Sequence, residues 1–361
     1  MPTLRRCCAV RADGVEIKTR AEPPPHLAGR NVMKRRIRWL MVAFAASWAA
    51  PPAMAQDEGA APIRPRPAEI QPLAPQSLLL DVINTGRRLV AVGDRGHILV
   101  SADGNLWAQV EAPVRSALTA VQFAKGGEAG WAVGHDAVIL RTVDGGATWS
   151  LQNFEPELQR PFLDLLVLDA DSAIVVGSYG MMRRTDDGGA TWTQVDAPEV
   201  LEDEFHLNSI TRLDDGSLFV AGEMGLLAIS PDKGKTWIRL ESPYESSFFG
   251  AVGTGGPGVM IHGLRGTLYT NRDPLNQRGA DAWQPIENDN VATMFGSARL
   301  DDGRTVMVGL NGVVTLVEGR QIQHFRSARG TPLSAVIGFG DGLLAVGESG
   351  VQRAPLTLSE R

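Results

Sequence analysis

Seven copies of one short pattern recur along this chain, and they constrain its fold more than any other feature. Each copy is an apolar run that ends in a glycine, two variable residues, usually a second glycine, and another apolar run. The first glycines are 41, 43, 45, 41, 46 and 38 residues apart, at Gly93, Gly134, Gly177, Gly222, Gly263, Gly309 and Gly347. A repeat of about 40 residues indicates an array of small, equivalent structural units.

Each unit has the size of one propeller blade. A Gly-x-x-Gly between two apolar runs predicts a tight β-hairpin, because glycine readily adopts the positive φ angles of such turns. A strand-like run precedes each hairpin, as at 118–123 and 333–339, and further strand-like runs follow most of them. No segment shows a sustained helical period. We therefore predict an all-β fold, a single seven-bladed β-propeller over residues 77–358.

A second motif recurs where the third and fourth strands of a unit would connect. Its full copies run from Asp144 to Trp149, from Asp187 to Trp192 and from Asp232 to Trp237. A shorter copy ends at Trp107, a stretched copy ends at Trp283, and the last two units lack the motif. The pattern resembles the Asp-box, or BNR, repeat. Its expected role is structural, because a short acid accepts hydrogen bonds from its own turn and tryptophan buries a large ring.

Residues 33–55 have the composition of a secretory signal peptide. Met33 is followed by four basic residues, a short apolar run over 39–50 and an Ala-x-Ala site that ends at Ala55. We expect cleavage after Ala55 and a periplasmic mature protein; a signal that stays attached would instead anchor it at the inner membrane. Residues 1–32 then represent an over-extended gene start, and the proline-rich residues 56–76 a linker or a lead-in strand.

Composition excludes several classes of partner and cofactor. Residues 56–361 hold 25 Lys and Arg against 38 Asp and Glu, an acidic balance that argues against nucleic acid and anionic lipid as partners. Both cysteines precede residue 33, and the five later histidines lie in different repeats. We expect no metal, no cofactor and no direct membrane insertion after signal cleavage.

Asp-boxes also occur in sialidases, so catalysis is the main alternative. Those enzymes need a tyrosine nucleophile with a partner glutamate, and three arginines that bind a carboxylate. The mature chain has three tyrosines, Tyr179, Tyr244 and Tyr269, and none lies in the closing unit, where sialidases place the nucleophile. We expect no catalytic residue. A carbohydrate-binding or sialidase-like propeller is the second hypothesis, which exposed aromatic side chains around one pore mouth would favour.

Equivalent hairpin positions should lie together on one face of a propeller. The residue before the second hairpin glycine is Arg95, Tyr179, Met224, Arg265, Asn311 or Ser349, with Asp136 at this position in the irregular second repeat. Arginine, tyrosine and methionine are enriched in protein interfaces. We predict that a partner is bound by Arg95, Tyr179, Met224, Arg265 and Asn311. We also expect Arg141, Arg183 and Arg184 to extend this basic area.

A signal peptide followed by a single propeller with degenerate Asp-boxes resembles the photosystem II stability/assembly factor family. The resemblance covers the whole mature chain and rests on the hairpins and the three full Asp-boxes. It implies an assembly factor that binds a membrane-protein intermediate through an arginine-rich face, which we carry over to Arg95 and Arg265. For a non-photosynthetic bacterial branch it implies a monomeric periplasmic scaffold for an inner-membrane complex, such as an exporter of the resistance-nodulation-division type.

Overall fold

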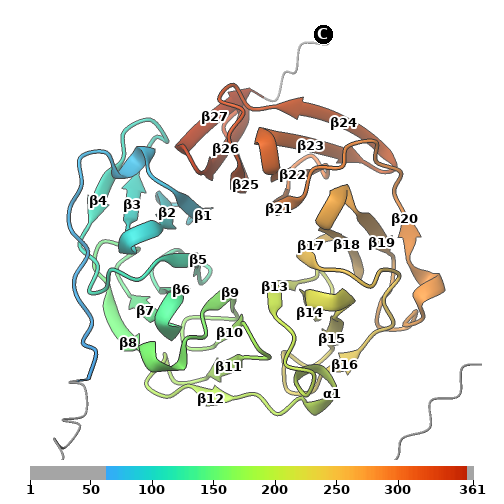
Figure 1. The fold of residues 1–361 in the computed structure, drawn as a ribbon, viewed down its shortest axis with the longest axis horizontal. Helices are drawn as coiled ribbons and strands as arrows, with labels where there is room; N and C mark the ends of the chain where they lie inside the picture. Colours follow the sequence, from blue (N-terminus) through green and yellow to red (C-terminus); the bar gives the residue numbers. More distant parts are fainter. Residues whose placement is uncertain (1–61, 356–361) are drawn as a thin grey trace, which may run out of the picture. The chain divides into compact units, whose positions relative to one another are not determined.

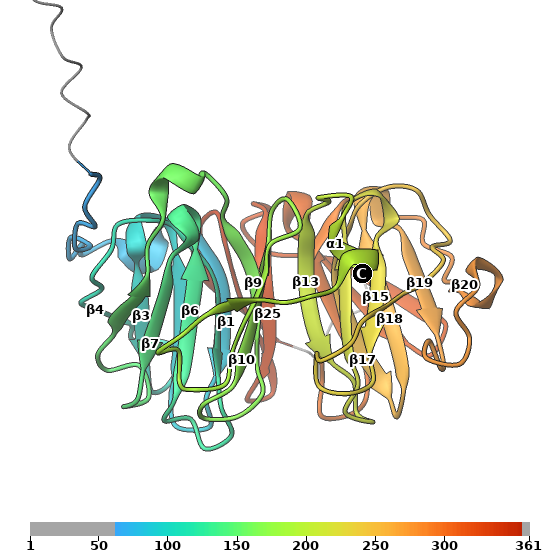
Figure 2. The same cartoon turned by 90° about the horizontal axis from the view of Figure 1, so that it is seen from below.

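The computed structural model describes residues 62–355. These residues form seven small antiparallel sheets arranged around a central channel (Figure 1), and Figure 2 shows the ring from the side. The predicted all-β, seven-bladed propeller is confirmed. The predicted gene start and signal peptide lie outside the described residues and stay predictions.

Four strands form each of the first six blades, and three described strands form the seventh. Blade 1 comprises β1 (Leu79–Asn84), β2 (Leu89–Gly93), β3 (Ile98–Ser101) and β4 (Ala108–Val110). Blade 2 comprises β5 (Leu118–Phe123), β6 (Gly130–Gly134), β7 (Ile139–Thr142) and β8 (Ser150–Asn153). Blade 3 comprises β9 (Phe162–Val167), β10 (Ala173–Gly177), β11 (Met182–Thr185) and β12 (Thr193–Gln194).

The remaining blades repeat this order from the channel outward. Blade 4 comprises β13 (Leu207–Arg212), β14 (Leu218–Gly222), β15 (Leu227–Ser230) and β16 (Ile238–Arg239). Blade 5 comprises β17 (Phe248–Gly255), β18 (Gly258–Gly263), β19 (Leu268–Asn271) and β20 (Gln284–Pro285). Blade 6 comprises β21 (Met294–Arg299), β22 (Thr305–Gly309), β23 (Val313–Glu318) and β24 (Gln321–Arg326). Blade 7 comprises β25 (Leu333–Phe339), β26 (Gly342–Gly347) and β27 (Gly350–Pro355).

Helical structure is limited to single turns. The 3-10 turns are η1 (Ala74–Gln76), η2 (Asp94–Gly96), η3 (His135–Ala137), η4 (Pro156–Leu158), η5 (Glu223–Gly225), η6 (Leu264–Gly266), η7 (Ala280–Ala282) and η8 (Leu310–Gly312). The one α-helical turn in this range is α1 (Pro198–Leu201). Across residues 62–355, no helix has the length and apolar character needed to cross a membrane.

The core lies between the blades rather than within them. Alternate side chains of one strand pack on opposite neighbours: Val90 and Val92 of β2 join a cluster with blade 2, whereas Leu89 and Ala91 join a cluster with blade 7. Each of the seven blade junctions has one such cluster among the described residues. Burial on both faces explains why these strands appear as continuous apolar runs in the sequence.

The ring closes by side-chain packing between blades 7 and 1. Leu344 and Val346 of blade 7 share a cluster with Leu79 and Leu89 of blade 1. The sequence left open whether the proline-rich lead-in or residues 353–358 complete the last blade. Residues 62–73 form no strand; they pack along blade 1, where the Ala68 N–H donates to the Ala112 carbonyl over 2.9 Å. Of 353–358, the described part, 353–355, belongs to the third strand, β27.

The Asp-boxes stabilise the loops between third and fourth strands through hydrogen bonds. The Asp144 carboxylate accepts from the hydroxyl groups of Thr142 (2.8 Å) and Thr148 (2.6 Å) and from the Thr148 N–H (2.9 Å). The same bonds recur at Asp187 and Asp232. The Thr148 hydroxyl is the main cause that lowers the pKa of Asp144 to about 2.

The tryptophan that ends each Asp-box packs at the junction with the preceding blade. Trp149 of blade 2 joins the cluster with blade 1, and Trp237 of blade 4 joins the cluster with blade 3. Trp283 of the stretched copy packs edge-to-face on Phe219 of blade 4, with ring centroids 6.1 Å apart. The Asp-box therefore does two things at once: it orders a loop and it covers a blade junction.

Loss of the central carboxylate should destabilise the propeller. We expect Asp144→Ala to lower the free energy of unfolding by about 1–2 kcal/mol, because the turn loses three hydrogen bonds. Urea denaturation of the purified protein measures this change. Asp301→Ala, which removes an exposed aspartate from the β21–β22 turn, should stay within about 0.5 kcal/mol of wild type. Equal losses in the two variants would contradict this role of the box.

Candidate protein-binding face

The turns between second and third strands lie on one face of the ring, facing the viewer in Figure 1. The second variable residue of the turn has φ between 53° and 59° in six blades, at Arg95, Asp136, Tyr179, Met224, Arg265 and Asn311; a glycine follows it in five of them, and Ala137 follows it in blade 2. Sequence analysis assigned the positive φ to glycine alone. In blade 7 the turn is shorter, and Ser349 is not among the residues with positive φ. We call the six turns the hairpin face.

The left-handed residue holds its side chain in solvent. The first glycine is fixed by close approach instead: a Cβ on Gly93 would lie 2.3 Å from the Leu78 carbonyl oxygen. The side chain of Arg95 is 70% exposed, Met224 is 57% exposed and Tyr179 is 48% exposed. A non-glycine residue in this conformation costs about 1–2 kcal/mol. Such backbone strain at exposed positions supports a functional role for these side chains.

Tyr179 is held between two neighbours. The Arg160 guanidinium lies 5.2 Å from its ring centroid, and the His206 ring packs edge-on at 4.9 Å. His206 in turn lies 3.8 Å from the carboxylate of Glu223, the residue before Met224. A partly exposed tyrosine of fixed orientation and an exposed methionine therefore sit on adjacent blades.

A pocket of mixed polar and apolar lining lies beside the hairpin turn of blade 6. It has a volume of about 480 Å³, and its lining includes Val291, Leu310, Asn311 and Arg326. Val291 is 77% exposed. Sequence analysis missed Val291, because the connections between blades differ in length and have no repeat-equivalent positions. Leu310 is the first of the two variable residues in its hairpin, whereas the predicted face was drawn from the second variable residue alone.

The predicted residues do not form an even ring. Tyr179, Met224, Arg265 and Asn311 occupy four consecutive blades, 3 to 6, and we call them, with Val291 and Leu310, the recognition arc. Arg95 lies on blade 1, and the blade between it and Tyr179 carries Asp136 at the equivalent position. Asp136 accepts a hydrogen bond from the Ser116 hydroxyl over 2.5 Å.

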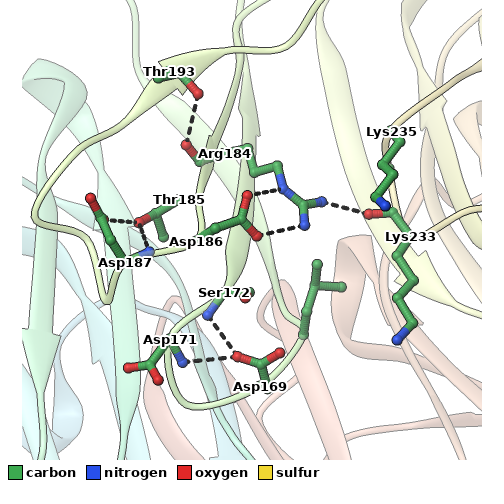
Figure 3. A network of polar contacts seen from close by, with 12 residues as sticks. Asp169, Asp171, Ser172, Arg184, Thr185, Asp186, Asp187, Thr193, Lys233 and Lys235 are labelled. Carbon is green, nitrogen blue, oxygen red and sulfur yellow. Dashed lines mark hydrogen bonds and ion pairs between the residues drawn. The ribbon is translucent and has the colours of Figure 1, made fainter.

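The expectation that three further arginines extend the basic area is wrong. Arg183 pairs with Glu155 at 2.6 Å. Arg184 binds both carboxylate oxygens of Asp186, and it also donates to the Lys233 carbonyl of the next blade (Figure 3). The Arg141 guanidinium lies 4.3 Å from the Trp131 ring centroid. Arg183 and Arg184 are thus paired with carboxylates of the same chain, and Arg141 packs on an aromatic ring.

Two half-buried aspartates line the central channel, and sequence analysis did not single them out. Asp81 accepts the N–H groups of Val82 and of Val121 in the next blade, both over 2.8 Å. Asp164 makes the equivalent bonds from blade 3 to blade 4. Burial is the main cause that raises the pKa of Asp81 to about 7 and the pKa of Asp164 to about 6. Their only sequence signal is an acid at the third position of an apolar strand.

The remaining tyrosines pack against an aromatic side chain of blade 5. Tyr244 and Tyr269 pack on Phe248, with ring centroids 5.8 and 6.5 Å away. Among residues 62–355, no three His, Cys, Asp or Glu side chains are placed to hold a metal ion.

The protein therefore belongs to the class of single seven-bladed propellers with Asp-boxes in the loops between third and fourth strands. A family model described as "Photosynthesis system II assembly factor YCF48" matches residues 99–161 and 152–322, and the chain belongs to this family. No curated protein matches its sequence.

Solved structures share the fold at low sequence identity. YCF48 bound to a D1 peptide is 18% identical, with 82% of this chain and 98% of that chain covered and a TM-score of 0.62. YCF48 from Cyanidioschyzon merolae is 19% identical, with 78% and 96% covered and a TM-score of 0.62. The WD40 propeller domain of Doa1 is 10% identical, with 79% and 94% covered and a TM-score of 0.59. Identities this low show the fold alone.

The channel carboxylate makes stability depend on pH. A pKa of Asp81 raised from 3.8 to about 7 means that the folded state binds its proton more tightly, so its contribution to stability grows as pH falls from 7 to 5. The buried His262, whose pKa is lowered to about 4, acts in the opposite direction. We therefore compare wild type with Asp81→Asn, in which the His262 effect cancels.

Between pH 7 and pH 5, wild type should gain on the order of 1–2 kcal/mol relative to Asp81→Asn. Urea denaturation at both pH values measures the difference. A parallel pH dependence in the two proteins would show that Asp81 titrates normally in the folded state.

The left-handed turn can be tested at Arg265. Arg265→Val should lower the free energy of unfolding by about 1–2 kcal/mol, because a β-branched residue resists positive φ. Arg265→Asn should stay within about 0.5 kcal/mol of wild type, since asparagine tolerates this conformation. Thermal or urea unfolding distinguishes them, and an equally stable valine variant would contradict the assignment.

Proposed function

We propose that this chain is an exported, non-catalytic scaffold that binds a segment of a protein partner on its hairpin face. Its role is that of an assembly or stability factor for an envelope membrane complex, carried out by a monomer in the periplasm. The observation that carries the proposal is the recognition arc: an oriented tyrosine, an exposed methionine and Arg265, followed by a pocket of mixed polar and apolar lining at Asn311. Family membership supports it, as does a fold neighbour described as YCF48 bound to a D1 peptide.

The chemistry of the arc selects a partner with both apolar and acidic groups. Tyrosine and arginine dominate the binding energy of protein interfaces, because they bury area and still offer hydrogen bonds. The Arg265 guanidinium has no acidic partner among residues 62–355, so it can pair with a carboxylate of the partner. A loop of an envelope membrane complex would provide such groups. Our candidates for this complex are exporters of the resistance-nodulation-division type.

The carbohydrate hypothesis finds less support in the exposed surface. Of the large apolar side chains exposed within the described range, Tyr179 is the one aromatic residue. Sugar sites commonly stack rings on several aromatic faces, and a pore mouth surrounded by them would have favoured that function. The surface instead combines one tyrosine with aliphatic, thioether and arginine side chains.

The proposal is tested by affinity purification of the tagged protein from cross-linked, detergent-solubilised envelopes. Wild type should enrich one membrane protein or its complex. Arg265→Glu should reduce this enrichment by about tenfold, because reversal of an interface charge commonly costs a few kcal/mol. Arg95→Glu should reduce it less, since Arg95 lies outside the arc, and the double variant should bind least.

Arg87→Glu provides the matched control. It makes the same charge change at an exposed arginine in the β1–β2 turn, on the opposite face of the ring. Its enrichment should equal that of wild type. If no membrane protein is enriched by wild type, or if Arg87→Glu loses it equally, the hairpin face is not the binding surface, and a glycan array becomes the next measurement.

A further inference from the structure

Blade 7 ends in an open strand edge within residues 62–355. β27 pairs with β26 from Gly350 to Pro355, next to a two-residue turn at Glu348 and Ser349. In an antiparallel pair, alternate residues direct their backbone N–H and C=O groups toward and away from the partner strand. Gly350 and Gln352 therefore bond to β26, whereas Val351 and Arg353 direct these groups outward. No described strand pairs with this side.

A cavity of about 230 Å³ opens beside this edge, between blades 6 and 7. Its apolar lining includes Val308, Val314, Leu333, Leu343 and Val351. Sites for whole drug-sized ligands are typically about 300–1,000 Å³. The smaller volume fits one apolar side chain of a longer ligand that lies along the edge.

Two buried polar atoms of this cavity lack a hydrogen-bond partner in the described part of the chain. They are the Ser327 hydroxyl oxygen and the Gln352 amide nitrogen. Buried polar groups are nearly always paired in folded proteins. The polar groups of this junction are therefore incompletely satisfied within the described residues.

Two arginines with no acidic partner within residues 62–355 flank β27: Arg329 lies at the rim of the cavity, and the Arg353 guanidinium lies on the other face of the strand, toward blade 1. The Arg353 guanidinium donates to the Asn105 side-chain oxygen over 2.9 Å and lies 5.2 Å from the Phe339 ring centroid. Arg329 donates to the Ser349 carbonyl. Arg239 and Arg299, by contrast, each contact a carboxylate at 2.6 Å. The positive charge beside β27 is therefore free to attract an acidic ligand.

We propose that β27 accepts an extended segment of a partner protein as the fourth strand of blade 7. The segment hydrogen-bonds to the outward groups of Val351 and Arg353, places one apolar side chain in the cavity and presents a carboxylate to Arg353 on the opposite, blade 1 side of the strand. Strand addition of this kind obtains affinity from main-chain bonds and specificity from side-chain pockets. This surface lies at the open edge of blade 7, apart from the recognition arc, and it does not depend on the function proposed for that arc.

A designed peptide tests the edge directly. The probe is fluorescein-labelled Asp-Val-Thr-Val-Thr-Val-Asp, and the control is the same peptide N-methylated at alternate residues so that it cannot pair along one side. Fluorescence anisotropy with the purified protein should show binding at least about tenfold tighter for the unmethylated probe. Equal binding of the two peptides would overturn the proposal.

Protein variants separate the edge from the hairpin face. Arg353→Pro removes an outward N–H group and should weaken probe binding by about tenfold, and Arg353→Ala, which removes the charge alone, by about threefold. Arg265→Glu should change it by less than about twofold, so failure of either proposal is recognised independently. Melting curves like that of wild type confirm that the variants are folded.

Two other occupants of the edge are outcomes that overturn the proposal. If the probe binds only to a chain that ends at Pro355, the chain's own residues 356–361 occupy the edge. If wild type forms a dimer that Arg353→Pro disrupts, a second copy occupies it.

Discussion

The architecture depends on apolar strands that are buried on both faces between neighbouring blades. A single blade has no core of its own, because its side chains alternate between the cluster before it and the cluster after it. Each blade therefore depends on both of its neighbours for its core. Cross-blade hydrogen bonds strengthen the same junctions from the channel side, where Asp81 and Asp164 accept N–H groups of the next blade. The Asp-box tryptophans cover the junctions from the loop side.

Much of this fold could be predicted from the sequence because it repeats. The seven hairpin repeats, six of which read Gly-x-x-Gly, give the number of blades, and the run at 118–123 coincides with the observed strand. The arginines of the expected basic area could not be assigned, because their partners lie far away in the chain: Arg183 meets Glu155, and Arg184 meets the carbonyl of Lys233. The sequence shows that a residue is charged, but only the structure shows which distant residue neutralises that charge.

The composition of the hairpin face was predicted in part for the same reason. Repeat-equivalent positions identified Tyr179, Met224 and Arg265 on adjacent blades, since the period fixes which face they share. Val291 lies in a connection that no other blade reproduces, so the repeat gives no information about it. The open edge of β27 was equally hidden, because the period ends there and only the pairing of strands shows which side is unoccupied.

The left-handed turn has a consequence for how such proteins diversify. Its geometry is set by main-chain hydrogen bonds and, in five of the six turns, by two glycines, and arginine, aspartate, tyrosine, methionine and asparagine all occupy the same position within one molecule. The fold therefore places little constraint on the identity of these residues. Drift at these positions can change what the surface recognises while the blades beneath stay intact. Scaffold and specificity are in this way free to evolve at different rates.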